Sequence, residues 1–594
     1  MTEATAIRRQ PFTSQTGSLF YQVAMSQPTS HLFEVTLQVS NWQLATLDLK
    51  MPVWTPGSYL VREYARHLQD FKAQDSQGKI LPHQKLGKNY WQVATEDTSE
   101  IKVSYRVYAN ELTVRTNHLD ATHGYFNGAA LFFFVPGLEQ QSIKVKIDPP
   151  YPEWRIATTL PPVPGESNTF IAADFDTLVD TPVEVGTQQV YDFEVLGKPH
   201  SLAIWSQGNP NPEQIIADTT KIIEVEAAMF GGLPYEQYLF LLHLSGSGYG
   251  GLEHKDCCTL NYPRFGFRDR DKYERFLQLV AHEFFHLWNV KRIRPKALEK
   301  FDYEVENYTT SLWFCEGTTS YYDILFPLRA GIYNRDTYLT NLSKDISKYL
   351  NTLGRTVQPL GESSYDAWIK LYRRNAYSDN NQISYYLKGQ LVSLLLDLLI
   401  RAKHHNKRSL DNVMQLLWQR FGQDEIGFTE AQLRSTISEV AQVNLDDFFT
   451  RYIETTEELP FDDYLAPFGL YLQAVAESDA PYLGIKVNSD NNQEKITYVA
   501  AESPAAIAGI DALDQLLAID GIKANAKSLN ERLKDYQPGD MIQVTVFHQD
   551  ELKTLPVTLA KPQTNSYKLA IKDNLSSEEQ ANLVGWLGEA SNKL

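Results

Sequence analysis

The chain has 594 residues, which is more than one hydrophobic core supports and predicts three or four domains. A hydrophobic content of 43% and a charged content of 22% are typical of a soluble globular protein. The formal net charge of −18 argues against a nucleic-acid binder, because no basic stripe offsets it, and mildly favours substrates that carry an ammonium group.

The cysteines and the N-terminus bear on the cellular compartment. Three cysteines do not make a disulfide framework, so we expect a reducing environment. Residues 1–11 lack an apolar core after their arginines and are not expected to form a secretory signal. No apolar run approaches the ~20 residues needed to span a bilayer. We therefore expect a cytoplasmic protein with neither nucleic-acid nor membrane partners.

Residues 1–190 are predicted to form an N-terminal β-sandwich-like domain. Residues 19–23, 31–39 and 101–108 alternate polar and apolar side chains or are rich in β-branched and aromatic residues, as strands are. Proline clusters punctuate the later part of the domain. Its simplest role is to support the rest of the protein, and a loop formed by residues 125–128 is a candidate to line a functional site.

Residues 191–345 are predicted to form a mixed domain. Within it, residues 238–244 form an apolar strand that leads into a glycine cluster. The cluster is not a phosphate loop, because it lacks Gly-Lys-Ser/Thr and no helical pattern follows it. Glycines instead allow a backbone to lie close beside an extended peptide. We therefore expect Gly250 and Gly251 to contribute to substrate binding.

His282, Glu283 and His286 form a His-Glu-x-x-His pattern inside an apolar run. In a helix, histidines four positions apart project from one face and can bind one metal ion, with Glu283 beside them. Apolar residues cover nearly every side of this helix, which predicts that it is buried. Ionisable side chains in a buried helix need partners, and a metal ion is one such partner. Two core histidines bonded to carbonyl groups are the alternative.

A catalytic zinc site normally has three protein ligands and one water, so a third ligand is required. Glu316 lies in a second apolar and aromatic segment, which could pack as a helix against the first. Cys315 is a rival ligand but is more simply explained as a small core residue. Glu304 and Glu306 belong to an acidic stretch that we expect to be exposed. The expected ligands of one Zn²⁺ are His282, His286 and Glu316.

Residues 471–565 are predicted to form a separate module. The order of its segments resembles the PDZ domains of bacterial proteases. The resemblance implies a loop whose backbone N–H groups bind a peptide carboxylate, followed by a strand that pairs with the peptide. A PDZ-shaped packing unit without a ligand is the alternative. The three residues of the expected carboxylate loop are Leu483, Gly484 and Ile485.

Helical patterns flank this module. Residues 346–470 are predicted to form a helical domain that completes the site, with a buried helix at 391–400 and an amphipathic helix at 413–418. Residues 566–594 form a tail, in which a helix start precedes an apolar face at residues 583–587. We expect this tail helix to dock onto the body of the protein.

The His-Glu-x-x-His pattern, followed by Trp-Phe-x-Glu-Gly-x-x-x-Tyr, resembles the gluzincin metallopeptidases and among them the glycyl aminopeptidase family. Residues 54–62 look like the N-terminal signature of that family. Residues 289–295, which follow the His-Glu-x-x-His helix, are also similar to the family's sequence. Residues 250–254 are similar to its Gly-x-x-Glu segment, and residues 386–389 to its Tyr-x-Lys-Gly motif. No position expected to be catalytic departs from the family pattern.

The resemblance implies a multidomain α+β protein with an N-terminal β-sandwich-like domain, a thermolysin-like zinc peptidase domain at residues 191–345, a helical domain and a C-terminal PDZ domain. It also implies an aminopeptidase that prefers N-terminal glycine or alanine. Glu283 would accept a proton from metal-activated water and deliver it to the leaving nitrogen. Tyr386, or alternatively Tyr385, would donate a hydrogen bond to the oxyanion. Glu253 would hold the α-ammonium of the substrate, unless it pairs with a basic residue such as Arg292 or Arg294.

Two other functions compete with the zinc aminopeptidase. One is a zinc endopeptidase to which the PDZ module delivers peptides. The other belongs to a different class, a catalytically inactive scaffold that binds peptides. An inactive relative usually lacks a ligand or the general base, and neither is missing here. The expected partners are peptides with a free N-terminus and a peptide C-terminus at the PDZ module.

Overall fold

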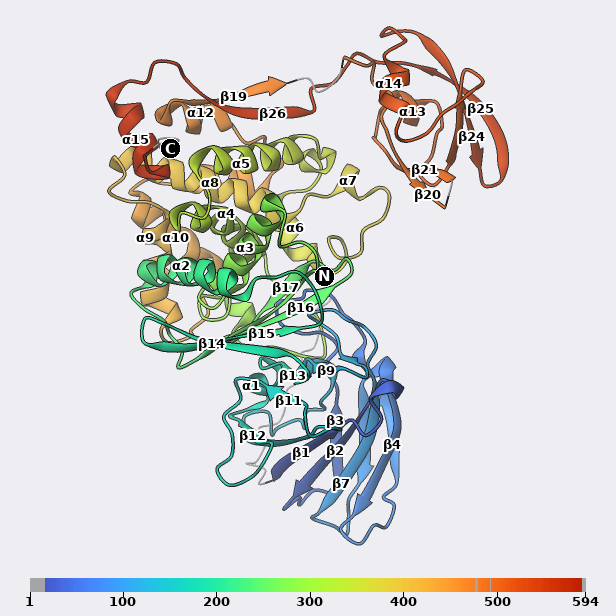
Figure 1. The fold of residues 1–594 in the computed structure, drawn as a ribbon, viewed down its shortest axis with the longest axis vertical. Coiled ribbons are helices and arrows are strands. Elements are labelled where there is room, and N and C mark those ends of the chain that lie inside the picture. The colour runs from blue at the N-terminus through green and yellow to red at the C-terminus, as the bar shows by residue number, and fades with distance from the viewer. Residues whose placement is uncertain (1–16, 476–478, 492, 590–594) are drawn as a thin grey trace, which may run out of the picture. The chain divides into compact units, whose positions relative to one another are not determined.

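The computed structural model describes residues 17–475, 479–491 and 493–589, and the chain forms two structural units. The first unit is built from the chain up to Glu224 together with Gly231–Leu287 and Lys300–Asn307. The second is built from Val225–Phe230, Trp288–Glu299 and the chain from Tyr308 onward. The protein is α+β and multidomain, with a β-rich N-terminal part, a helical middle part and a C-terminal β-rich module (Figure 1).

The first sheet of the first unit has six strands in the order β12-β10-β1-β2-β7-β4. Strands β1 and β10 are parallel, whereas the other neighbours are antiparallel. The strands predicted at residues 19–23, 31–39 and 101–108 are confirmed as β1, β2 and β7. The bounds are β1 (Ser18–Ala24), β2 (Leu32–Ser40), β4 (Leu68–Asp75), β7 (Ile101–Tyr108), β10 (Ile143–Asp148) and β12 (Thr169–Ala172).

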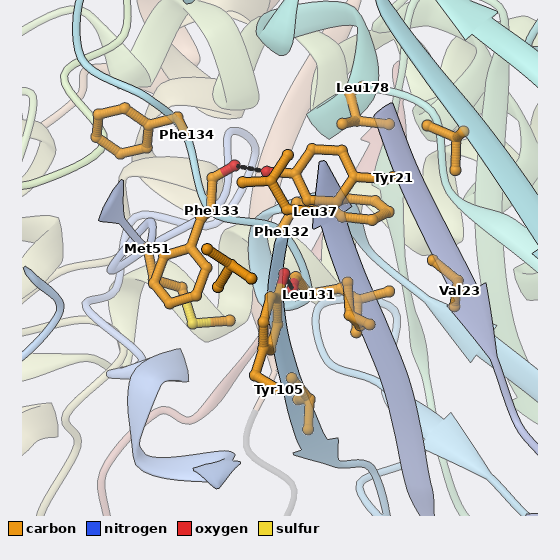
Figure 2. Close-up of a cluster of buried hydrophobic side chains, with 14 of the residues drawn as sticks. Tyr21, Val23, Leu37, Met51, Tyr105, Leu131, Phe132, Phe133, Phe134 and Leu178 are labelled. Carbon is orange, nitrogen blue, oxygen red and sulfur yellow. Dashed lines mark hydrogen bonds between the residues drawn. The ribbon is translucent and has the colours of Figure 1, made fainter. Parts of the chain in front are cut away.

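An aromatic core packs against this sheet, and Figure 2 shows part of it. The Tyr21 hydroxyl donates to the Phe133 carbonyl at 2.5 Å, and the Tyr105 hydroxyl donates to the Leu131 carbonyl at 3.0 Å. These bonds satisfy polar groups that burial would otherwise make costly. Two smaller sheets, in the orders β3-β6-β5 and β11-β13-β9-β8, share the unit. Their strands are β3 (Thr46–Lys50), β5 (His83–Gly87), β6 (Tyr90–Ala94), β8 (His118–Leu119), β9 (His123–Phe126), β11 (Arg155–Ala157) and β13 (Val183–Gly186).

A five-stranded sheet carries the segments predicted to be functional in the first unit. Its order is β14-β15-β16-β18-β17; β15, β16 and β18 are parallel, and the outer strands β14 and β17 are antiparallel to their neighbours. Helix α3 packs against β17 and β18, and its Phe284 ring lies 5.0 Å from that of Tyr238 on β16. The bounds are β14 (Gln189–Val195), β15 (Lys198–Trp205), β16 (Tyr238–Ser245), β17 (Gly250–Glu253), β18 (Cys257–Pro263), α2 (Pro212–Phe230) and α3 (Arg270–Phe285).

Helix α8 is the central helix of the second unit and contacts α4, α5, α6, α9 and α10. The segment Ser378–His404 is long and apolar enough to cross a membrane, but 83% of its most apolar stretch is buried inside the structure. Within the fold, α8 is therefore a core helix, as its apolar sequence predicts. The bounds are α4 (Thr318–Arg329), α5 (Arg335–Leu350), α6 (Leu360–Tyr365), α7 (Ser378–Asn381), α8 (Tyr385–His404), α9 (Leu410–Leu417), α10 (Glu430–Ala441), α11 (Asp446–Phe449) and α12 (Phe461–Leu465).

The C-terminal module is inserted into a β-hairpin. Strands β19 and β26 pair antiparallel and lie side by side in Figure 1, with Val475 opposite Ser566 at the end where the module begins and ends. The module has its own sheet, in the order β20-β21-β22-β24-β25 with β23 beside β22, and its own apolar core. The bounds are β19 (Leu470–Val475), β20 (Ile485–Asp490), β21 (Gln493–Val499), β22 (Gln515–Ile519), β23 (Ile522–Lys523), β24 (Met541–His548), β25 (Glu551–Thr558), β26 (Ser566–Ile571), α13 (Pro504–Ile507) and α14 (Leu529–Leu533).

The predicted tail helix is confirmed as α15 (Ser577–Leu587), which begins with a capping box formed by Ser576 and Glu579. Its Trp586 is 3% exposed and donates from Nε1 to the Tyr321 hydroxyl at 3.3 Å. The Trp586 ring also packs against Phe468 at 5.5 Å. The tail therefore completes the apolar core of the helical part.

Removing the module alone should destabilise the protein much less than removing everything after Val475. We expect a chain in which Asn-Gly joins Val475 to Ser566 to keep the hairpin, because that pair suits a two-residue turn. Truncation after Val475 also removes β26 and the buried Leu583, Trp586 and Leu587, which costs on the order of 5 kcal/mol. Thermal unfolding of both variants tests this. Equal destabilisation would show that the tail contributes nothing to the body.

Candidate active site

Helix α3 places the two histidines of the His-Glu-x-x-His pattern side by side. His282 and Glu283 lie in its last turn, and His286 is its C-terminal cap. The imidazole centroids are 4.6 Å apart and the ring planes are inclined at 85°. Glu283 and His286 are buried, whereas His282 is partly exposed. Two imidazoles on one face, one of them reachable from solvent, suit the binding of a single ion.

Strand β17 passes directly over Glu283. A Cβ atom built on Gly251 would lie 2.2 Å from Cδ and 2.3 Å from Oε1 of Glu283. Side-chain atoms do not approach that closely, so only glycine fits at this position. The reason is the contact and not the backbone conformation, which is that of an ordinary extended strand. Gly250 precedes it with a φ of +139°. The two glycines predicted to lie along a substrate thus form the strand that presses against Glu283.

Glu253 lies on the same strand and is 3% exposed. One ligand atom of Glu253, one of Glu283 and one of His286 lie within 4.8 Å of one another. Among the described residues, nothing donates a hydrogen bond to Oε1 of Glu253. A buried carboxylate oxygen without a donor is costly, so this oxygen has the capacity to accept a hydrogen bond from a ligand.

Residues of the N-terminal β-rich part contact β17 and β18 at the edge of the five-stranded sheet. Arg115 donates from Nη2 to the Gly251 carbonyl at 3.1 Å, and the Tyr125 hydroxyl lies 3.0 Å from Oγ1 of Thr259. In the loop before η2 (Tyr64–His67), Gly57 has a φ of +82°, and a Cβ there would lie 2.6 Å from both carboxylate oxygens of Glu253. The prediction of a loop at residues 125–128 is wrong in part, because Tyr125 and Phe126 belong to the buried strand β9.

Glu316 and Tyr386 are brought together in the second unit by a contact between glycines. Glu316 is 2% exposed and lies in the π-helix η5 (Trp313–Gly317). A Cβ on Gly317 would lie 2.5 Å from Cα of Gly389 on α8, so the two backbones touch. Tyr386 lies one turn before Gly389, in the first turn of α8. Burial, and then the nearby Glu316 carboxylate, raise the pKa of Tyr386 well above its usual value. The phenol therefore keeps its proton and can donate a hydrogen bond.

Exposure distinguishes Tyr386 from its neighbour Tyr385. Tyr385 is fully buried, whereas Tyr386 is partly exposed and can reach a ligand. The hydroxyl of Tyr372 lies 2.9 Å from that of Tyr386 and 3.2 Å from that of Tyr385. Tyr372 is a candidate that sequence reasoning missed, because its segment lacks helical or strand periodicity.

The rival metal ligands do not gather with other donors. Cys315 is buried, and no group of three His, Cys, Asp or Glu side chains able to hold a metal among the described residues includes it. The same is true of Glu304 and Glu306 in the described part of the chain. Glu304 instead pairs with Lys50 at 2.8 Å. Arg294, which follows helix α3 in the sequence and was a possible partner of Glu253, pairs with Glu425, with Nη2 3.6 Å from Oε2.

A groove of about 710 Å³ is lined by residues of the C-terminal module together with residues of α5 and β26, among them Leu350 and Tyr567. Leu483, Gly484 and Ile485 line it beside Leu529 and Leu533 of α14. Strand β20, which follows this loop, is the outermost strand of its sheet and pairs with β21. The groove therefore combines an apolar floor with an exposed strand edge, the arrangement to which an extended peptide binds.

The module is docked onto the segment that precedes α8. Asn380, which is 3% exposed, donates from Nδ2 to the Val499 carbonyl at 2.9 Å. Its Oδ1 accepts from the Tyr498 hydroxyl at 2.8 Å and from the Ala501 N–H at 3.0 Å. Both polar atoms of this side-chain amide thus join the module to the chain six residues before Tyr386.

Comparison with known proteins gives three family matches. Residues 20–187 match the Peptidase M61 N-terminal domain, residues 275–392 match M61 glycyl aminopeptidase, and residues 481–559 match a PDZ domain. A search of curated proteins gave no match.

Two solved structures resemble the protein to different degrees. An aminopeptidase N family protein from Idiomarina loihiensis is 32% identical, with a TM-score of 0.90 over 96% of this chain and 100% of that one. An M1 zinc metallopeptidase from Deinococcus radiodurans is 12% identical, with a TM-score of 0.46 over 75% of this chain and 95% of that one. The second likeness is too distant to carry an argument.

Proposed function

The chain belongs to the M61 glycyl aminopeptidase family and is a metallopeptidase, and we propose that it is a zinc-dependent aminopeptidase that removes N-terminal glycine or alanine from peptides. The observation that carries the proposal is the buried Glu253 carboxylate, with an oxygen to spare, beside Glu283 and His286. The α-ammonium of a peptide supplies the donor that this oxygen lacks. Binding there would place the first peptide bond at the reacting residues.

We propose that one Zn²⁺ is held by His282, His286 and Glu316. Two imidazoles and one carboxylate are a ligand set of catalytic zinc sites, with a fourth position open. His282 and His286 lie side by side on helix α3, and Glu316 is a buried carboxylate in η5. Zinc bound there supplies a Lewis acid that polarises the scissile carbonyl and makes water more acidic.

The remaining residues would handle protons and charge. Glu283, held in place beneath Gly251, takes a proton from the attacking water on its carboxylate and returns it to the leaving nitrogen. Tyr386 keeps its phenol proton and donates a hydrogen bond to the oxyanion. The Tyr372 hydroxyl orients the Tyr386 hydroxyl at 2.9 Å.

The PDZ domain supports peptide binding as a second part of the function. We propose that its groove at Leu483, Gly484 and Ile485 takes a peptide C-terminus, because the loop offers backbone N–H groups at the start of a strand edge. A cytoplasmic location is also part of the proposal and is supported by a cysteine content too low for a disulfide framework.

Substitution of Glu253 tests exopeptidase character. Glu253→Gln keeps the shape but removes the charge, and a charge-assisted bond to an ammonium is worth about 1.5–3 kcal/mol. We expect kcat/KM on free glycyl and alanyl dipeptides to fall by roughly one to two orders of magnitude. N-acetylated dipeptides should be poor substrates of both proteins. The matched control is Glu236→Gln, whose side chain is 96% exposed, and it should have no effect.

Three outcomes would contradict the proposal, each in its own way. Wild-type cleavage of N-acetylated and free peptides at equal rates would identify an endopeptidase. Equal losses on both substrates after Glu253→Gln would give Glu253 a structural role. Wild-type protein without metal, even after reconstitution with zinc, would support the peptide-binding scaffold.

A further inference from the structure

Besides the residues of helix α3, the first unit contains another cluster of histidine and carboxylate side chains, the residue types that can bind a metal ion. His118 is on β8, Asp120 follows it in the turn to β9, and His123 begins β9. Glu184 on β13 and His243 on β16 complete the cluster. His123, Glu184 and His243 are each at most 1% exposed, whereas His118 and Asp120 are partly exposed.

Glu184 fixes the orientation of two of the imidazoles. Nδ1 of His123 lies 2.6 Å from Oε1 of Glu184, and Nε2 of His243 lies 2.9 Å from Oε2. A carboxylate accepts hydrogen bonds, so Nδ1 of His123 carries a proton, and in the neutral ring Nε2 carries the lone pair. The His123 ring is also stacked on Trp205, with centroids 3.5 Å apart and planes at 9°. The lone pair of Nε2 therefore has a fixed direction.

Beside Nε2 of His123 lie two further side chains that can bind a metal ion, His118 and Asp120. Nε2 of His123 and Nδ1 of His118 share a hydrogen bond of 2.7 Å, and a bound metal ion would take the place of the shared proton. One ligand atom of His118, one of Asp120 and one of His123 lie within 4.8 Å of one another. The Asp120 side chain is itself oriented, because its Oδ1 accepts from the backbone N–H groups of Thr122 and His123. Two imidazoles and a carboxylate thus converge on one place at the tip of the β8–β9 hairpin.

We propose that His118, Asp120 and His123 form a second metal site that binds a divalent transition-metal cation such as Zn²⁺. Two imidazole nitrogens and one carboxylate oxygen match the ligand preference of zinc. Glu184 accepts a hydrogen bond from Nδ1 of His123, the ring nitrogen that would not bind the metal, and this carboxylate–histidine–metal arrangement is a common support of metal sites. His243 holds the second oxygen of the same carboxylate.

Charge and access also favour a bound cation. Among the described residues, the ion-pair partners of the buried Glu184 are His123 and His243, whose ring nitrogens lie 2.6 and 2.9 Å from its two oxygens. Burying a carboxylate is costly, and a divalent cation bound to His123 would add positive charge beside it. The partial exposure of His118 and Asp120 gives the ion a route from solvent and leaves room for water as a further ligand.

Zinc stoichiometry of the full chain tests the site. Each protein is saturated with zinc sulfate, desalted and analysed for zinc per chain. We expect two zinc ions in the wild type, one in His118→Ala, one in His286→Ala and none in the double variant. Asp120→Asn, which keeps an oxygen for the turn but removes the charge, should weaken the second site. The control is His405→Ala, whose side chain is 71% exposed, and it should retain both ions.

Folding and the proposed catalytic site are separated by two comparisons. Cobalt(II) added to His286→Ala should give visible ligand-field absorption that disappears when His118→Ala is added, while circular dichroism stays unchanged. One zinc in the wild type that His118→Ala removes and His286→Ala retains would support this site and contradict the catalytic ligand set. One zinc that His118→Ala leaves in place would overturn the second site, and the cluster would then be a hydrogen-bond relay.

Discussion

Glu283→Gln is expected to abolish nearly all peptidase activity while the protein keeps its metal. Glutamine has the shape of glutamate but cannot take a proton from water, and loss of a general base typically costs about 10²–10⁴-fold in rate. The proposed metal ligands are unchanged. His286→Ala should instead lose metal and activity together, because two ligands hold zinc much more weakly than three. Zinc content and kcat on a glycyl dipeptide measure both effects.

The pair of substitutions separates general base from ligand. Glu236→Gln, on an exposed side chain of the same unit, controls for the change of charge and should behave as wild type. Turnover of Glu283→Gln at the wild-type rate would show that Glu283 is not the base. Retention of zinc by His286→Ala at wild-type affinity would remove His286 from the ligand set.

Gly251→Ala should be nearly as damaging, although it removes no reactive group. The added Cβ would lie 2.2 Å from Cδ of Glu283, so the carboxylate or strand β17 has to move. A displacement of about 1 Å at a reacting group can cost 10²-fold in rate, and overpacking costs about 1–3 kcal/mol of stability. We expect kcat to fall by about 100-fold with zinc retained. The measurements are kcat, zinc content and thermal unfolding.

The chain contains a matched glycine for comparison. A Cβ on Gly246, which lies a few residues earlier in the same segment, would meet no atom within 4 Å. Gly246→Ala should therefore have wild-type activity. Wild-type activity of Gly251→Ala would mean that the contact between β17 and Glu283 does not position the base.

Features encoded by neighbouring residues were predictable from the sequence. The four-residue spacing of His282 and His286 gives one helix face, and hydrophobic periodicity identifies α8. The capping pair Ser576 and Glu579 marks the start of α15 within four residues. Each of these signals lies within a few turns of chain, where spacing alone determines geometry.

Features created by contacts distant in sequence were not predictable. Gly251 meets Glu283, and Arg115 meets Gly251, only because β17 pairs at the end of its sheet and the N-terminal part packs there. The cluster around Glu184 and His243 likewise depends on strand neighbours that hydrophobic patterns do not specify. The insertion of the PDZ domain into the β19–β26 hairpin was missed because neither strand has a distinctive pattern.

The π-helix at Glu316 could not be predicted from the sequence either. Its residues fit an ordinary helical pattern, and the extra residue in the turn leaves no periodic signal over so short a segment. The sequence predicted only that Glu316 is the candidate third ligand, and the structure adds the backbone geometry of the turn that carries it.

The contact between Gly317 and Gly389 has a mechanical consequence. Because the backbones touch with no side chain between them, a side chain at either glycine would push the turn that carries Glu316 away from α8. Such a change would also separate Glu316 from Tyr386, which lies in the first turn of α8. The distance between the Glu316 carboxylate and the Tyr386 phenol therefore depends on a contact between two backbones rather than on the side chains on the outer faces of the two helices.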